Sequence, residues 1–287
     1  MRVETFKAQN SKKLSELISS RLSLSYNVTQ KIIRSKDVKI NGKRISSDLV
    51  VNENDEITIY YKEVETPMVE ILYQDENIIV VFKRRNIETV NENGKIDLLS
   101  KVSEITSGTC YAVHRLDRNT EGLVVFALNE KSKNELDLAF KNRTIDKYYL
   151  ALVFGTFSKS EETLEAYLKK DSKKSLVYIS DIPKTGYEKI ITHYKVLKEK
   201  EDTSLLEVKL ITGKTHQIRA HLSHINHFII GDEKYGDSLV NKKFKKKYQC
   251  LCAYKVVFHF DKQSKLSYLN DKEVLLPIEK IDFCQNL

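Results

Sequence analysis

Residues 114–123 read HRLDRNTEGL and lead directly into an apolar run at residues 123–128. A short apolar run bounded by polar residues predicts a core strand, so Asp117 would lie on the loop that enters it. Arg115 and Arg118 flank the acid, and positive neighbours favour the ionised form of a carboxylate. Taken alone, this loop fits a surface salt-bridge loop better than a catalytic site.

Two further motifs follow. KYYLALVFG at 147–155 is an apolar run ending in glycine, which by itself predicts another core strand. TGKTHQIRAHL at 212–222 follows a predicted strand at 205–211 and opens a predicted helix, with Thr215 as its cap. On that helix His216 and Arg219 are three residues apart and share a face. An arginine there can meet an aspartate carried by another loop.

The order of these motifs resembles that of the RluA-type pseudouridine synthases, the large family that includes ribosomal and transfer RNA enzymes with S4 domains. The resemblance is carried by H-R-L-D-x-x-T-x-G-L, K-x-Y-L-A-L-V-x-G and T-G-x-T-H-Q-I-R-x-H-L, then by GDEKYG at 231–236 and LCAY at 251–254. It spans nearly the whole chain. A single motif could be coincidence, but several in the family's order argue against it. The resemblance implies an enzyme that isomerises uridine to pseudouridine in structured RNA.

The resemblance also implies roles for individual residues. Asp117 matches the catalytic aspartate, and Arg219 matches the basic residue that pairs with it. Tyr149 matches the active-site tyrosine because it stands two places after Lys147. Arg115 matches the residue that enters the RNA helix and displaces the target base. Four further positions of the same motifs are expected to contact the substrate: His114, Thr120, His216 and Gln217.

The implied reaction explains these residue types. The enzyme must break the N1–C1′ bond, turn the uracil while it stays bound, and reattach it through C5. A carboxylate beside the ribose can attack C1′ or act as a base at the 2′ position, and both routes stay open. Tyr149 offers a ring to stack on the extruded base and a hydroxyl for proton transfer near C5. The reaction has no redox step and no hydrolysis, so we expect no cofactor and no metal.

The chain departs from the family pattern near Asp117. Glu121 stands where a small serine is usual, and Asn119 where an aspartate is common. A second carboxylate in the site would disfavour ionisation of Asp117, so we expect Glu121 to point away. Residues 83–86 read KRRN in place of the usual K-P-x-G, which affects the choice of target more than the chemistry.

The N-terminal segment has a character of its own. Between residues 11 and 44 there are nine Lys or Arg residues against Glu16 and Asp37 alone. Two short helices are predicted, the second with Val28, Ile32 and Ile33 on one face, then a hairpin turn at residues 41–42 and a final strand at 56–60. This order resembles the S4 RNA-binding domain over residues 12–60. The resemblance places four residues on RNA phosphates: Lys31, Arg34, Lys36 and Lys43.

We therefore predict an α+β protein with an S4-like domain at 1–64, a linker at 65–70 and a catalytic domain at 71–287. Five apolar runs, at 78–82, 123–128, 149–154, 190–196 and 205–211, predict strands of a mixed, mainly antiparallel sheet. A helix is predicted at 129–142, between the second and the third of these runs. One departure from the S4 pattern lies at residues 36–37, where Lys-Asp replaces the usual glycine.

Composition agrees with an anionic partner. The 287 residues carry a formal charge of +8, and a basic protein of this kind favours nucleic acid as its partner. Four cysteines without C-x-x-C spacing predict reduced thiols. The N-terminus shows no apolar export signal, and no run approaches membrane-spanning length. We expect a cytoplasmic monomer whose partner is RNA, with ribosomal RNA as the first expectation and transfer RNA as the alternative.

Other interpretations stay open at this level. His216, His221, His224 and His227 lie close together in the sequence, with two cysteines further on, but no pair has zinc-ligand spacing. Five lysines surround one phenylalanine at 242–247, either as a solvated loop or as a phosphate contact. The protein could be an RNA-binding or ribosome-assembly factor with lost catalysis, or a basic hydrolase of small nucleosides. Release of free uracil from uridine would identify the nucleoside hydrolase.

Overall fold

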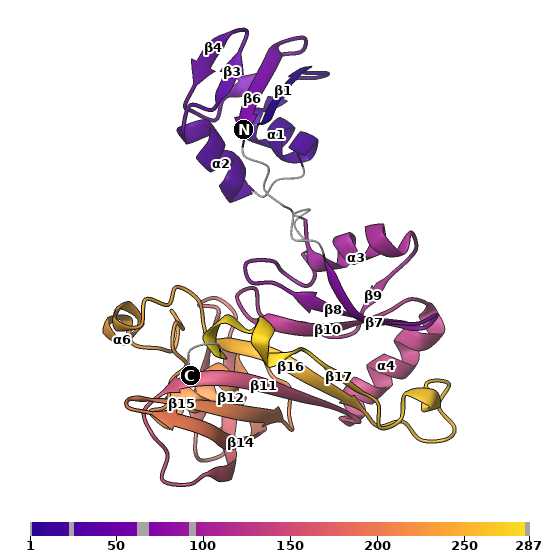
Figure 1. Ribbon diagram of the computed structural model, residues 1–287, viewed down its shortest axis with the longest axis vertical. Coiled ribbons are helices and arrows are strands. Elements are labelled where there is room, and N and C mark those ends of the chain that lie inside the picture. Colours follow the sequence, from indigo (N-terminus) through magenta and orange to yellow (C-terminus); the bar gives the residue numbers. More distant parts are fainter. Residues whose placement is uncertain (1, 23–25, 62–68, 92–95, 285–287) are drawn as a thin grey trace. The chain divides into compact units, whose positions relative to one another are not determined.

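The computed structural model describes residues 2–22, 26–61, 69–91 and 96–284, without the side chains of residues 2, 20 and 26–28. The chain forms two compact units, Met1–Met68 with Asn91–Ile96, and Val69–Val90 with Asp97–Leu287 (Figure 1). Most of the predicted linker at 65–70 and the side chain of Val28 lie outside the described residues. Among the described residues, no helix is long and apolar enough to cross a membrane.

The first unit is a four-stranded antiparallel sheet with two helices. Its strand order is β1-β6-β3-β4, and the unit contains β1 Arg2–Lys7, α1 Leu14–Leu22, α2 Tyr26–Arg34, β3 Val38–Ile40, β4 Lys43–Ile45 and β6 Glu56–Tyr61. A separate pair joins β2 Lys12–Lys13 to β5 Val50–Val51. Leu14 and Ile18 of α1 and Ile33 of α2 share one buried cluster with the sheet. The sequence pattern predicts the helices and the hairpin but not β1.

The turn before β3 keeps its shape without a glycine. Lys36 has φ 59°, in the left-handed region that normally favours glycine. Its backbone N–H donates to the Ile33 carbonyl at 3.0 Å, and its own carbonyl accepts from Arg44 Nη1 at 2.7 Å. Neighbouring hydrogen bonds thus hold the strained conformation, and the side chain of Lys36 is exposed.

The second unit is built on one long sheet. Its strands follow the order β13-β12-β14-β15-β11-β16-β10-β8-β7. Described strand pairs in this sheet are antiparallel except β10 with β16, which are parallel. The strands are β7 Glu70–Gln74, β8 Ile78–Lys83, β10 Glu121–Ala127, β11 Ile145–Phe154, β12 Glu161–Asp171, β13 Leu176–Ser180, β14 Glu188–Lys200, β15 Thr203–Leu210 and β16 Leu251–Phe258. The predicted α+β class with a mixed, mainly antiparallel sheet is confirmed.

Helices and short elements complete this unit. Figure 1 shows α3 Leu98–Thr106 and α4 Glu130–Asn142 beside the β7–β8–β10 end of the sheet. Asn129 caps α4 by accepting the N–H of Ser132 at 2.9 Å. The remaining helices are α5 Gln217–His224 and α6 Ser238–Lys243, and β9 Tyr111–Ala112 and β17 Glu273–Leu275 pair at the margins. All five predicted apolar runs form strands, and most of their buried side chains share one core cluster, while Ile190 of β14 belongs to a smaller one.

Gly122 allows β10 and β16 to meet. It has φ +130°, and a Cβ at this position would lie 2.3 Å from the Ala253 carbonyl oxygen. Any larger residue would push the two strands apart. The loop that carries Asp117 enters β10 at this point, so the glycine of the 114–123 motif fixes where the loop lies.

Candidate active site

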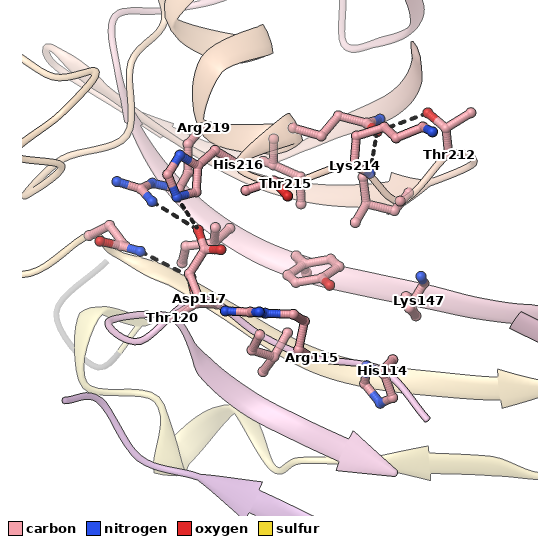
Figure 2. Close-up of a pocket in the computed structure, with 18 of the residues that line it drawn as sticks. His114, Arg115, Asp117, Thr120, Lys147, Thr212, Lys214, Thr215, His216 and Arg219 are labelled. Carbon is pink, nitrogen blue, oxygen red and sulfur yellow. Dashed lines mark hydrogen bonds and ion pairs between the residues drawn. The ribbon is translucent and has the colours of Figure 1, made fainter. Parts of the chain in front are cut away.

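A pocket of about 1340 Å³ opens where the 113–120 loop, β11 and the β15–α5 connection meet (Figure 2). Ten of its lining residues are Lys or Arg and four are Asp or Glu. Its volume exceeds the ~300–1,000 Å³ usual for small-molecule sites. Size and charge together suit a segment of an anionic polymer better than a single nucleoside.

The centre of the pocket is a chain of three charged groups. Arg219 Nη1 donates to Asp117 Oδ2 at 2.8 Å. Its Nε and Nη2 donate to the two carboxylate oxygens of Asp232, at 2.7 and 2.9 Å. The Asp232 side chain is 0% exposed and that of Arg219 7%, whereas that of Asp117 is 24% exposed. Arg219 is therefore fixed by a buried acid on one side and presents one nitrogen to an accessible acid on the other.

Burial and pairing oppose each other at this centre. Burial acts to raise the pKa of Asp232, but its hydrogen bonds with Arg219 outweigh this and lower it. Burial acts to lower the pKa of Arg219, but the two aspartates raise it overall. Both groups thus stay charged in the interior. The arginine that contacts Asp117 is Arg219, which is distant in the sequence. The adjacent Arg118 instead donates to Asn86 Oδ1 at 2.8 Å.

The start of α5 differs from the prediction. Its N-cap is His216, with φ 54° and no side-chain capping bond, so the prediction of Thr215 as the cap is wrong. His216 Nδ1 lies 2.9 Å from the Tyr235 hydroxyl, and its Nε2 lies 3.8 Å from Asp117 Oδ2. Burial lowers the pKa of His216. The strained backbone at His216 places the imidazole beside the catalytic candidate.

Gln217 and Thr120 support the pocket from behind. Gln217 Oε1 accepts from Thr212 Oγ1 at 2.9 Å, and its Nε2 donates to Thr192 Oγ1 at 3.0 Å. These bonds tie the β15–α5 connection to β14. Thr120 Oγ1 accepts from Gln249 Nε2 at 3.0 Å. Both side chains line the pocket but are almost fully buried, so they hold its walls in place.

The remaining predicted positions also line the pocket. Tyr149, on β11, is 6% exposed, and burial together with Asp117 raises its pKa. Arg115 is exposed at the pocket. His114 accepts the N–H of Val125 at Nε2, at 2.9 Å, and its ring lies 4.6 Å from that of Phe140. Burial lowers the pKa of His114 to about 3, so the ring is neutral and anchored to the strand.

Glu121 and Arg85, which both depart from the family pattern, pair with each other. Glu121 is buried and forms a salt bridge with Arg85, and it is not among the lining residues of the pocket. As predicted, Glu121 points away from the site. Burial raises the pKa of Glu121. The departures at 85 and 121 therefore compensate each other, a relation that neither motif shows alone.

Sequence reasoning assigned no role to Asp232, Tyr235 or Lys83. Asp232 and Tyr235 belong to the GDEKYG motif at 231–236. In the sequence, the acid that follows Gly231 in this motif was the feature that could have indicated a role in the site.

The four histidines of 216–227 have separate partners: His221 contacts Thr192, His224 contacts Asp181, and His227 contacts the Phe154 carbonyl. Within the described ranges, no three His, Cys, Asp or Glu side chains are grouped for a metal.

Lys83 joins the two loops behind the pocket. Its side chain is fully buried, and Nζ donates to the carbonyls of Arg84, Ile87 and Arg118 at 3.1, 2.9 and 3.1 Å. Burial lowers the pKa of Lys83 to about 7, against the opposing effect of Asp117 and Glu121. Since Arg118 follows Asp117, this lysine fixes the backbone of the loop that carries Asp117.

We expect Lys83→Met to destabilise the fold by about 3 kcal/mol, because three buried carbonyls lose their donor. Activity at a temperature where the variant is folded should also fall. Urea denaturation followed by circular dichroism measures the first effect. Lys133→Met is the matched control, since Lys133 is a partly exposed lysine in an i,i+4 pair with Asp137 and should change stability by less than about 0.5 kcal/mol. Equal stability of the two variants would show that Lys83 does not hold the loops.

Comparisons with known proteins identify the family. The model of the RNA pseudouridylate synthase family matches residues 77–224. An uncharacterized RNA pseudouridine synthase of Mycoplasma capricolum is 31% identical, over 86% of this chain and 87% of the relative. A ribosomal large subunit pseudouridine synthase C of Rickettsia bellii is 32% identical, over 75% of this chain and 79% of the relative.

Solved structures agree on the fold. Human RNA Pseudouridylate Synthase Domain Containing 1 superposes with a TM-score of 0.63 at 24% identity, over 79% of this chain and 90% of that chain. Human RNA Pseudouridylate Synthase Domain Containing 4 gives a TM-score of 0.56 at 20% identity, over 70% and 90%. With the family model covering more than half of the chain, this protein belongs to the RNA pseudouridylate synthase family and is an RNA pseudouridine synthase.

Proposed function

We propose that the protein converts specific uridines of large-subunit ribosomal RNA to pseudouridine, with Asp117 as the essential carboxylate. The observation that carries the proposal is the Asp117–Arg219–Asp232 chain, which presents one accessible acid in a strongly basic pocket. The choice of RNA is supported by relatives whose names specify the large ribosomal subunit, in two Rickettsia species.

In this proposal the pocket receives a uridine that has left its stack. Arg115, exposed at the pocket, takes the place of the displaced base in the RNA. The uracil lies against the ring of Tyr149, and the ribose lies beside Asp117. The carboxylate attacks C1′ or removes the 2′ proton, and either route requires its ionised form. Arg219 orients the carboxylate, because Asp232 fixes the guanidinium.

We propose that the first unit binds RNA as an S4-like domain. Lys31 and Arg34 end α2, and Lys36 and Lys43 follow on the turn and on β4. All four side chains are exposed, and none of them forms a salt bridge within the described part of the chain. An exposed cluster of free cations suits phosphate contacts, which provide affinity without sequence choice.

Replacing Lys31, Arg34, Lys36 and Lys43 together by alanine should weaken RNA binding and leave turnover of saturated enzyme unchanged. Each lost phosphate contact should reduce the slope of log affinity against log salt by ~0.7–0.9. Filter binding across a salt series measures this. A control with the same change of charge, at the exposed Lys195, Lys198, Lys200 and Lys262, should keep the wild-type slope. An unchanged slope in the first variant would remove the first unit from RNA binding.

Pseudouridine mapping tests the target. Total RNA from cells with and without the gene is labelled with carbodiimide and read by primer extension. The proposal predicts that particular stops in large-subunit RNA disappear without the gene. Stops lost from transfer RNA instead would correct the substrate, and no lost stop would favour a binding or assembly factor. Free uracil released by the purified protein would indicate a nucleoside hydrolase.

A further inference from the structure

Lys147 is a cation of the pocket that has no acidic partner among the residues the structure describes. It lies on β11, two residues before Tyr149, so both side chains project from the same face of the strand. Two other lysines of the pocket have acidic partners, Lys209 with Asp146 and Lys214 with Glu188. Within the described part of the chain, Lys147 forms no salt bridge, and its ammonium lies 5.4 Å from the centre of the Phe140 ring.

This ammonium is partly enclosed by the protein. Lys147 is half-buried, and a Cβ at Gly213 would lie only 3.1 Å from Nζ, so the β15–α5 connection closes over it. Burial lowers the pKa of Lys147. When a ligand fills the pocket, the remaining water leaves, and a charge buried without a partner is unfavourable. The ligand must then supply an acceptor or an anion at this place.

The order of Asp117, Tyr149 and Lys147 along the pocket indicates which atom of the ligand Lys147 contacts. Figure 2 shows Asp117 and Lys147 at separate places along the pocket. Residues two apart on a strand are about 6.6–6.8 Å apart, close to the length of a uracil ring with its oxygen. We place C1′ of the ribose at Asp117 and the uracil ring on Tyr149. O4 is then the uracil atom farthest from C1′, and it reaches Lys147.

We propose that Lys147 donates to O4 of the target uracil and stabilises the negative charge that the ring carries while it is detached. This inference rests on the proposed function. When the N1–C1′ bond breaks, its electron pair stays with the uracil and spreads over N1, O2, N3 and O4. A pair at C5 then forms the new bond to C1′, and C5 loses its proton while N1 gains one. Lys147 keeps its protons throughout.

A phosphate is the competing partner, and the geometry disfavours it. The phosphates of the target nucleotide are attached to the ribose, which lies at the Asp117 end of the pocket. Exposed cations at the rim, such as Lys141 and Arg143, are better placed for the RNA backbone. The proposed contact also discriminates between bases, because cytosine carries an amino donor at position 4 where uracil carries an acceptor. An ammonium facing that position accepts uridine and rejects cytidine.

The test compares single-turnover rates on RNA labelled with [5-³H]uridine and purified from cells that lack the gene. Formation of the C5–C1′ bond releases the tritium to water. Lys147→Met should lower the rate at saturating enzyme by ~10²–10³-fold, the usual effect of losing one donor to a developing anion. RNA affinity and its salt dependence should stay within about two-fold, and Lys147→Arg should recover part of the rate.

Lys255→Met is the matched control. Lys255 is a partly buried lysine on β16, 4.0 Å from the centre of the Tyr148 ring and paired with Glu207, and it does not line the pocket. It should react at the wild-type rate. If Lys147→Met does not fold, Lys147→Gln takes its place in the same comparison.

A wild-type rate in the Lys147 variant would overturn the inference and leave the proposed function intact. So would a normal rate at saturation combined with weaker binding and a smaller salt slope, because that result identifies a phosphate contact. No tritium release by the wild-type protein would overturn the proposed function, and the inference with it.

Discussion

The Asp117→Asn variant should form no detectable pseudouridine while it binds RNA within a few-fold of the wild-type affinity. Asparagine has the size of aspartate, and its carbonyl oxygen can still accept from Arg219, so the loop should keep its position. An amide, however, can neither attack C1′ nor take the 2′ proton. Loss of an essential nucleophile or base lowers the rate by on the order of 10⁴-fold or more. Tritium release and filter binding measure the two effects.

Asp146→Asn is the control for this variant. Asp146 also lines the pocket, but it pairs with Lys209 at 2.6 Å and does not contact Arg219. It should keep activity within a few-fold, because a partly exposed ion pair contributes little. Substantial activity in Asp117→Asn, or an equal loss in both variants, would remove Asp117 from the chemical step.

Arg219→Met should abolish activity and destabilise the protein by about 3–5 kcal/mol. The substitution leaves Asp232 buried without its partner, and breaking a buried ion pair is costly for this reason. It also leaves Asp117 without the guanidinium that orients it. The midpoint of urea denaturation measures the stability, and tritium release measures the activity.

A second substitution separates these two effects. Arg219→Met combined with Asp232→Leu removes the uncompensated charge and should recover most of the lost stability. It should not recover activity, because Asp117 still has no partner. If the double variant were active, Arg219 would matter only as a partner of Asp232. If Arg219→Met alone were as stable as the wild type, the buried pair would not hold this part of the fold.

Strands with continuous apolar runs could be predicted from the sequence, and polar strands could not. All residues of β8 and β10 are buried, and apart from Lys83 and Glu121 at their ends their sequences are apolar or glycine. By contrast, β12 and β1 carry many charged residues. They form because β12 pairs with β14 and β1 pairs with β6 over their lengths. Such pairing is a tertiary effect that local periodicity does not encode.

The same division applies to the site. The motifs indicated Asp117, Tyr149 and Arg219, and the structure brings all three to one pocket. Asp232 lies 115 residues beyond Asp117, and its contact with Arg219 depends on how the segment after α5 returns to it. The cap at Thr215 was mispredicted because the backbone stays irregular for one more residue, at His216, where the imidazole contacts Tyr235.

The most direct test of the central claim is pseudouridine mapping of large-subunit RNA in cells whose own gene is deleted and which carry either the wild-type gene or the Asp117→Asn gene at equal protein level. We predict that the wild-type gene restores the missing carbodiimide stops and that Asp117→Asn restores none. Stops restored by both genes would contradict the assignment of Asp117 as the catalytic carboxylate.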